Sequence, residues 1–400
     1  MVTLADAQLG NPDTYVQGVP YEVFKMLRRE APVVWQETPR GEGFWALTRY
    51  DDIIAVSQSH QTFSSAHGTN IEDQSGGTEL MMVNMDPPRH TKLRNLVSKG
   101  FTPKVVRAME PHIREVATSI IDRVARRGEC DFVTDVAAEL PLQVIAELIG
   151  IPIEDRHQIF EWSNQMIGLD DPEYGNSMDR AQQAAMGMFA YADSLAAKRT
   201  QEPRDDVVSI LMQAELDGEK LSPMEFDFFF LLLAVAGNET TRNLISGGML
   251  ALTEFPEERQ RLLADPSLLP TAVEEMLRWV TPVMYFRRTA LRDTEIRGQA
   301  IREGEKVTLW YPSANHDEDA FPDADRFDVG RTPNAHLTFG GGGVHFCLGA
   351  SLARLEIQTM FEELLRRLPD IQLAGPISRM RSNFISAIKH MPVTFTPERG

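Results

Sequence analysis

Cysteine, basic charge and long apolar runs are all scarce in this chain, and each shortage excludes a class of protein. Cys130 and Cys347 are the only cysteines among 400 residues, which excludes a disulfide framework and a cluster of thiolate ligands. Acidic residues outnumber basic ones by 58 to 40, and the net charge of -18 argues against a nucleic-acid partner. The longest apolar run, residues 228–237, is well short of the roughly 20 residues that span a bilayer.

The remaining composition is that of an ordinary globular protein, with 42% hydrophobic and 24% charged residues. Residues 1–6 contain no basic segment followed by an apolar run, so we expect neither a signal peptide nor a membrane anchor. Together with the low cysteine content, this predicts a cytoplasmic protein.

One cysteine, Cys347, lies where a glycine-rich segment meets a helical pattern. Residues 340–343 are four consecutive glycines, and apolar residues recur every three to four positions over residues 348–368. Glycine lets the backbone approach a large flat group closely. The free N–H groups and the dipole at a helix start favour a thiolate over a thiol. These features predict that Cys347 is the axial thiolate ligand of a haem iron.

A second pattern predicts a long helix that crosses the protein interior. Ser222, Pro223 and Glu225 form a strong helix start with a capping box. The pattern continues to about Thr253, roughly 45 Å at 1.5 Å per residue. Apolar residues cover almost every face of its first half, as expected for a buried helix.

The middle of this helix contains residues that are unfavourable in a buried helix. Glycine costs about 1 kcal/mol relative to alanine there, and a buried carboxylate is costly unless paired. We expect Ala236 and Gly237 to leave room for a ligand, Thr240 to hydrogen-bond a bound oxygen species, and Glu239 to help supply protons. The alternative is that Thr240 only bonds back to a preceding carbonyl. Thr241 is the second choice for the hydroxyl.

These segments resemble the haem-binding loop and the oxygen-activation motif of the cytochrome P450 family, and other family signatures follow along nearly the whole chain. Phe339 lies eight residues before Cys347, one more than in the commonest family pattern, because the loop has an extra glycine. The resemblance implies a mainly α-helical P450 fold with a small β region, as one domain over residues 1–400. Its long central helix would lie over a thiolate-ligated haem b, with Phe339 and Gly349 beside the cofactor.

The resemblance also assigns charged residues around the haem. Glu275 and Arg278, three residues apart on one helical face, would join Arg326 in a buried network behind the loop that presents Cys347. The two haem propionates need cations or hydrogen-bond donors when partly buried. Their expected partners are His90, Arg94, Arg288 and His345.

Apolar residues dominate the segments that the family places around the substrate. We expect the substrate pocket to be lined by Met82, Val83, Leu232, Val235, Ala236, Val283, Phe384 and Ile385. No charge stands out as a partner for a substrate carboxylate. We therefore expect a bulky, weakly polar substrate such as a steroid, a terpenoid or a branched lipid.

The first functional hypothesis is a monooxygenase, in which RH, O₂ and two electrons give ROH and water. Because 400 residues leave no room for a reductase domain, we expect a monomer that receives electrons from a ferredoxin and its reductase. The alternatives are a peroxide-driven peroxygenase and a non-catalytic haem sensor, and the Glu239–Thr240 pair argues against both. Product formation with a redox chain, with peroxide alone, or with neither distinguishes the three.

Short patterns outside these motifs predict the remaining elements. We expect a helix over residues 20–30, mainly helices between residues 103 and 365, and few strands. The expected strands cover residues 33–35, 44–48, 287–294, 306–310 and 392–395.

Overall fold

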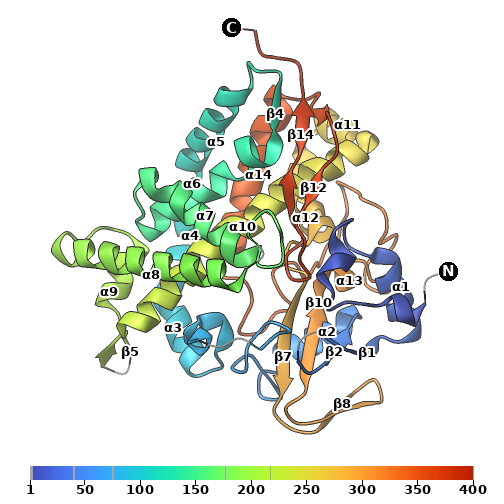
Figure 1. Ribbon diagram of the computed structural model, residues 1–400. Helices are drawn as coiled ribbons and strands as arrows, with labels where there is room; N and C mark the ends of the chain where they lie inside the picture. The colour runs from blue at the N-terminus through green and yellow to red at the C-terminus, as the bar shows by residue number, and fades with distance from the viewer. Residues whose placement is uncertain (1–2, 39–40, 74–75, 176, 217, 400) are drawn as a thin grey trace.

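The computed structural model describes residues 3–38, 41–73, 76–175, 177–216 and 218–399. Helices make up most of the molecule, as the sequence predicts, and the largest sheet lies at one side with smaller groups of strands apart from it (Figure 1). The α-helices are α1 (Tyr21–Glu30), α2 (Tyr50–Gln58), α3 (Arg89–Ser98), α4 (Pro103–Ala108), α5 (Glu110–Val124), α6 (Glu139–Ile149), α7 (Arg156–Ile167), α8 (Met178–Gln201), α9 (Val207–Gln213), α10 (Pro223–Glu254), α11 (Pro256–Ala264), α12 (Leu269–Val280), α13 (Tyr311–Asn315) and α14 (Ala350–Arg367).

The 32-residue helix α10 is the predicted central helix, and it runs diagonally through the helical body (Figure 1). Its first turn has the expected capping box: the Ser222 side chain accepts a hydrogen bond from the Glu225 backbone, and the Glu225 carboxylate accepts one from Ser222 N at 2.8 Å. The helix packs against α6, α8, α12 and α14. Its apolar side chains are therefore buried on several sides at once, which explains why they lack a simple amphipathic pattern.

Five short strands form the largest sheet, in the order β1-β2-β10-β7-β3. Strand β10 (Lys306–Trp310) pairs parallel with β2 (Phe44–Leu47) and antiparallel with β7 (Tyr285–Ala290). The strand expected over residues 287–294 is interrupted, because the chain leaves this sheet after Ala290 and begins a separate hairpin at β8 (Thr294–Ile296). The other strands are β1 (Val33–Gln36), β3 (Phe63–Ser64), β4 (Glu129–Asp131), β5 (Glu215–Leu216), β6 (Glu219–Lys220), β9 (Gln299–Ile301), β11 (Gln372–Leu373), β12 (Ser378–Arg379), β13 (Ile388–His390) and β14 (Pro392–Thr394).

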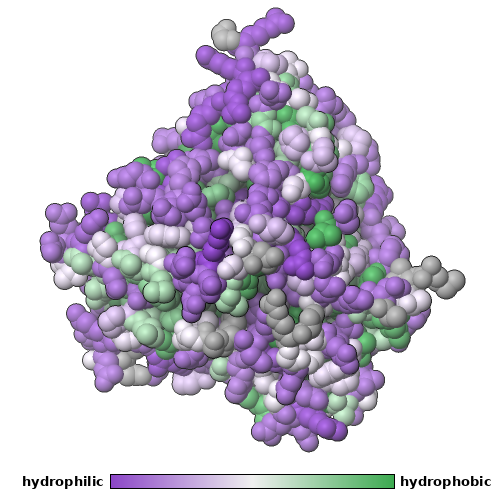
Figure 2. Space-filling model, viewed as in Figure 1, coloured by the Kyte–Doolittle hydropathy of each residue, from purple (hydrophilic) through white to green (hydrophobic). Residues whose placement is uncertain are grey.

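Two large apolar clusters lie along α10, the first on its second half and the second on its first half. One joins it to α5, α12 and α14, and the other joins it to α6, α8 and α9. The face seen in Figure 2 is mainly hydrophilic, with hydrophobic residues in small separate groups. In the described part of the chain, no helix combines the length and the apolarity needed to cross a membrane.

Candidate active site

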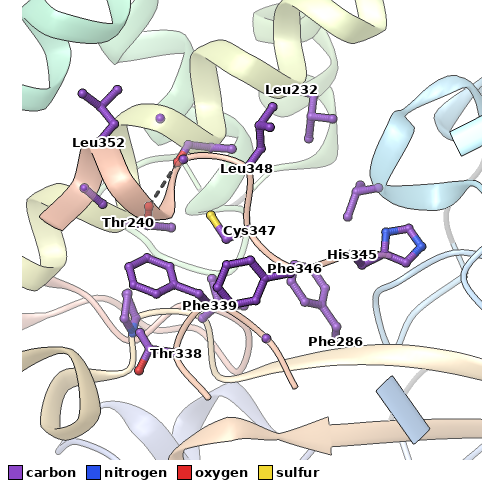
Figure 3. Close-up of a pocket in the computed structure, with 18 of the residues that line it drawn as sticks. Leu232, Thr240, Phe286, Thr338, Phe339, His345, Phe346, Cys347, Leu348 and Leu352 are labelled. Atoms are coloured by element: carbon purple, nitrogen blue, oxygen red, sulfur yellow. Dashed lines mark hydrogen bonds between the residues drawn. The ribbon is translucent and has the colours of Figure 1, made fainter. Parts of the chain in front are cut away.

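A cavity between α10, α14 and the sheet region brings the predicted site residues together. Cys347 lies on its wall, and in the view of Figure 3 Thr240 lies to its left, Phe339 and Phe346 below it and His345 to its right. The walls expose far more apolar than polar surface. The helix α10 and the loop before α14 therefore meet around a single, mostly apolar space.

The glycine-rich loop has a backbone that only glycine adopts easily. Gly340, Gly342 and Gly343 have positive φ values of 98°, 85° and 74°. At Gly341, a Cβ atom would lie 2.5 Å from Ser57 Oγ, so α2 leaves no room for a side chain. The loop closes where Cys347 N donates a hydrogen bond to Phe339 O at 2.9 Å. The glycines thus fix the path of the loop that presents the thiol.

The Cys347 side chain is open toward the cavity and otherwise enclosed by protein. Burial raises the pKa of this thiol, whereas hydrogen bonds from the Gly349 and Ala350 backbone and the charges of Arg94 and Arg354 lower it. The start of α14 therefore supports an anion, as the sequence predicts, but these groups do not fully offset burial. A cation bound at the sulfur would stabilise the thiolate further.

Phe339 packs directly behind the loop. Its ring lies 6.4 Å from that of Phe346, and the Arg354 guanidinium stands 4.5 Å from its centroid. Arg354 also donates to Glu274 at 2.6 Å and 2.9 Å. Burial raises the pKa of Glu274, but its bonds with Arg354 and His336 outweigh this and hold the pKa at about 2. The extra glycine is thus accommodated with Phe339 still at the base of the loop.

Four basic residues gather at the end of the cavity near His345. The rings of His90 and His345 lie 4.2 Å apart, and His90 Nδ1 and His345 Nε2 are buried without a hydrogen-bond partner. Burial lowers the pKa of His90 to about 4 and that of His345 to about 2, and it also lowers the pKa of Arg94 and Arg288. Arg94 and Arg288 donate to the backbone carbonyls of Phe346 and Arg287, and among the described residues neither forms an ion pair with a carboxylate. The cluster is therefore complementary to an anionic ligand.

Thr240 and Glu239 point in different directions although they are adjacent. Thr240 lines the cavity, and its Oγ1 donates to Ala236 O at 3.1 Å, the dashed line in Figure 3. Glu239 is buried away from the cavity wall and pairs with Arg242, which donates to Asn164 on α7 at 2.9 Å. Burial raises the pKa of Glu239, although Arg242 opposes this shift. The structure therefore brings Thr240, but not Glu239, to the cavity.

The predicted charged network lies behind the loop, but its third member is Arg331 and not Arg326. Arg278 Nε and Nη2 each donate to Glu275 at 2.8 Å, and both side chains are fully buried. Arg331 Nε donates to the same carboxylate at 3.1 Å and 3.2 Å. Arg326 contributes only its backbone carbonyl to Arg278, while its side chain is 63% exposed near Glu258. The prediction for the Arg326 side chain is wrong because the chain turns it outward.

Comparison with known proteins agrees with this geometry. The family model described as Cytochrome P450 matches residues 9–369. This chain belongs to the cytochrome P450 family. A steroid C26-monooxygenase from Rhodococcus jostii (strain RHA1) is 44% identical over 98% of this chain and 85% of its own length. A methyl-branched lipid omega-hydroxylase from Mycobacterium tuberculosis (strain ATCC 25618 / H37Rv) is 44% identical over 99% of this chain and 96% of its own.

A solved relative has the same architecture. A Mycobacterium marinum cytochrome P450, in complex with pseudoionone, superposes with a TM-score of 0.90 and 45% identity over 94% of each chain. The chain is accordingly a P450 oxygenase, and its cofactor is a haem iron.

The walls of this P450 cavity agree only partly with the predicted substrate pocket. Met82, Val83, Leu232, Ala236 and Val283 line it. The other three predicted residues are absent from the described lining, and each has a structural reason. Val235 lies about 100° around α10 from Ala236 and packs in the α6–α8 cluster. Phe384 and Ile385 lie behind the wall. The Phe384 ring contacts the Phe286 ring, with 5.8 Å between their centroids, and Ile385 forms a backbone bridge with Val283.

Gly237 lines the cavity beside Ala236, as predicted, and it also has a packing role. A Cβ atom there would lie 2.5 Å from Ile145 of α6, so the glycine permits close helix packing. Ala236, which is exposed on the cavity side, adds to the room for a ligand at this level.

Several further polar residues of the cavity were not assigned from the sequence, among them Ser57, Tyr311 and Thr338. Thr241, only a second choice, lines the wall beside Thr240, and the Glu356 carboxyl of α14 lines it as well. The sequence contains a pattern that would have predicted Glu356 at the cavity. Glu356 continues the helical stripe of Gly349, Leu352 and Ala353, where a carboxyl group is unexpected.

Proposed function

We propose that this P450 is a haem-thiolate monooxygenase that hydroxylates a hydrophobic small molecule, namely a steroid, a terpenoid or a branched lipid. The overall reaction is RH + O₂ + 2 e⁻ + 2 H⁺ → ROH + H₂O. The observation that carries the proposal is a thiol on a largely apolar cavity whose other end is a basic cluster, in which Arg94 and Arg288 have no carboxylate partner among the described residues.

The residues of the cavity fit haem b. Cys347 would ligate the iron, and Gly349, where a Cβ would meet nothing within 4 Å, leaves the adjacent backbone open to a flat ligand. The propionates would supply the anions that the basic cluster lacks, held by His90, Arg94, Arg288 and His345. A thiolate-ligated haem supplies the chemistry that activates O₂, because the thiolate favours O–O cleavage.

Thr240 is the hydroxyl best placed to serve the oxygen chemistry. A hydroxyl has one donor and two acceptor sites, and the donor of Thr240 is used by Ala236 O. Its acceptor sites are therefore available to a water molecule or a protonated oxygen in the cavity. Glu239 would act at a distance by positioning Thr240 through α10, or would deliver protons only after separating from Arg242.

The apolar walls support the proposed substrate class. Met82, Leu232 and Val283 offer hydrocarbon contacts and no hydrogen bonds, so binding depends on removing apolar surface from water. The named relatives act on a steroid and on a methyl-branched lipid. A branched hydrocarbon portion is common to both substrate classes, and the proposed substrate shares it.

We propose that a ferredoxin and its reductase supply the electrons, and that the chain works as a cytoplasmic monomer with one domain over residues 1–400. Exposed Lys99, Lys104 and Arg107 lie on α4 and the turn before it, beside Phe101, which lines the cavity. An acidic ferredoxin docked there would be close to the cofactor. Such an interaction weakens as salt increases.

The experiment combines substrate binding with turnover. Purified holoenzyme is titrated with steroids, terpenoids and branched fatty acids, and displacement of the haem-bound water is read as a Soret shift. Compounds that bind are then incubated with ferredoxin, reductase and NAD(P)H, with peroxide alone, or with neither. The proposal expects hydroxylated product only with the redox chain. Product with peroxide alone favours a peroxygenase, and ligand binding without product favours a sensor.

A further inference from the structure

We propose that Asp73 is a positioning residue for the substrate wall, because its carboxylate fastens the segment that carries Met82 and Val83 to two buried cations of the sheet. This segment connects β3 to α3, and a turn of 3-10 helix, Met82–Asn84, brings the two apolar residues to the cavity. Because it concerns how the hydrophobic substrate is held, this role rests on the proposed function.

The two cations lie on neighbouring strands of the largest sheet. Arg287 of β7 is opposite Thr308 of β10, and Lys306 precedes Thr308 by two residues, so Arg287 and Lys306 share one face of the sheet. Each of them is only 4% exposed. Arg288, the next residue of β7, points to the other face and lines the cavity. The sheet therefore presents Arg288 to the cavity and a separate pair of cations to residues 69–73.

The Asp73 carboxylate joins both cations. Its Oδ1 accepts a hydrogen bond from Arg287 Nη1 at 2.6 Å, and its Oδ2 accepts one from Lys306 Nζ at 2.8 Å. The same nitrogens also donate to backbone, Lys306 Nζ to Ile71 O at 3.1 Å and Arg287 Nη1 to Asn70 O at 3.2 Å. Among the described residues, no other carboxylate forms an ion pair with either cation. Burial raises the pKa of Asp73, but the bonds with Lys306 and Arg287 outweigh it and hold the pKa below its usual value.

Hydrogen bonds extend this attachment to the cavity wall. Thr69 O accepts a hydrogen bond from Arg287 N at 2.8 Å, and Thr69 Oγ1 donates to Asn84 Oδ1 at 2.8 Å. Asn84 Nδ2 donates in turn to Thr78 O at 2.9 Å. Asn84 is 2% exposed and directly follows the two wall residues. Its side chain thus links the arm that Asp73 holds to the arm that forms the wall.

The charge of Asp73 decides whether the attached position of the segment is favourable. With the segment in place two cations are buried, and a buried charge is costly unless it is paired. Even so, Arg287 Nε has no hydrogen-bond partner among the described residues. Without the Asp73 charge, a displaced segment that lets water reach both cations becomes more favourable. Substrate affinity then falls in proportion to the fraction of molecules that keep the wall in place.

The test compares Asp73→Asn with Glu79→Gln, an exposed carboxylate of the same segment, in holoenzyme. Testosterone and 15-methylhexadecanoic acid are the steroid and branched-lipid probes, and binding is read as a Soret shift. We expect Asp73→Asn to raise Kd and KM roughly tenfold, as when about a tenth of the molecules keep the wall in place. The kcat at saturating substrate and the ferrous–CO spectrum should stay as in wild type. Asp73→Glu, which keeps the charge, should recover most of the affinity.

Hydrogen exchange supplies a readout that needs no substrate. Backbone amides of residues 78–85 should exchange at least tenfold faster in Asp73→Asn than in Glu79→Gln, because the segment is displaced more often. Wild-type exchange in Asp73→Asn overturns the proposal, and so does a wild-type Kd. Failure of the wild type to form product with the redox chain contradicts the proposed function instead, and it leaves the comparison of exchange rates unaffected.

A double-mutant cycle tests whether the effect comes from the buried cations. Lys306→Met removes one of the two charges, so Asp73→Asn should cost only about threefold in affinity in that background. An equal loss in both backgrounds contradicts the proposal. If Lys306→Met does not retain haem, Asp73→Glu decides, since an affinity as low as that of Asp73→Asn would show that the charge is not what holds the segment.

Discussion

At the scale of single residues, neighbours in sequence turn out to have separate tasks. Glu239 and Thr240 follow each other on α10, but successive side chains of a helix point about 100° apart. Only Thr240 reaches the cavity, and Glu239 forms a buried pair with Arg242. The Glu239–Thr240 motif correctly predicted which part of α10 lines the cavity. The direction of each side chain depends on how α10 packs against α6 and α7, which the motif alone does not contain.

Thr240→Ala tests the proposed role of the hydroxyl. The variant removes one group from the wall and adds little strain, so haem content and substrate affinity should survive. Electron flow should continue, but more of it should end as hydrogen peroxide, because one positioned proton-transfer group is typically worth 10²–10⁴-fold in its step. Product per NAD(P)H consumed is the measurement. If the variant forms as much product per NAD(P)H as wild type, the proton transfer would be assigned to Thr241 or to water.

The buried Glu356 carboxyl on the cavity wall should affect the stability of the fold. Its pKa in the folded protein, about 8, lies above the usual 4.5, so folding is disfavoured progressively as pH rises from 4.5 to about 8. The cost is on the order of 3 kcal/mol at pH 7. Glu356→Gln cannot ionise, so its stability relative to wild type should increase between pH 5.5 and pH 8. Urea unfolding midpoints measure this, and a pH-independent difference would contradict the buried, neutral acid.

At the scale of elements, the strongest local signals predicted the structure well. The capping box placed the start of α10, and four glycines placed the loop before α14. The charged network around Glu275 shows that a local sequence pattern does not predict which nearby arginine side chain turns inward. Arg326 and Arg331 lie five residues apart in an irregular segment, and nothing in the sequence says which side chain turns inward. In the structure Arg331 is the residue whose side chain turns inward, where its Nε donates to the Glu275 carboxylate.

This distinction gives a matched pair of variants. Arg331→Ala leaves Glu275 with one fewer buried cation, and breaking a buried pair costs about 3–5 kcal/mol. We expect Arg331→Ala and Glu275→Ala to incorporate little haem. Arg326→Ala removes a 63% exposed side chain and should behave as wild type. The ratio of haem absorbance to protein absorbance after purification measures the effect, and equal haem content in Arg331→Ala and Arg326→Ala would reject the assignment.

At the scale of the whole molecule, the fold brings distant segments to one cavity. Residue 90 on α3, residue 240 on α10, residue 288 on β7 and residue 347 before α14 all line it. Helical periodicity predicted the mainly α-helical class, and the family resemblance predicted this convergence. The exact pocket was harder to predict, because Phe384 and Ile385 are separated from the cavity by the chain segment around Val283. Such layering is a tertiary property that apolar composition does not encode.

The central claim is that Cys347 is the thiolate ligand of a haem in an oxygen-activating P450. The most direct measurement is the absorption spectrum of the reduced protein with carbon monoxide, for wild type, Cys347→Ala and Cys130→Ala. Cys130 is buried away from the cavity, and burial raises its pKa to about 12, so it is the matched control. We predict a red-shifted Soret band in wild type and Cys130→Ala, and its loss in Cys347→Ala. A red-shifted band that persists in Cys347→Ala would contradict the account.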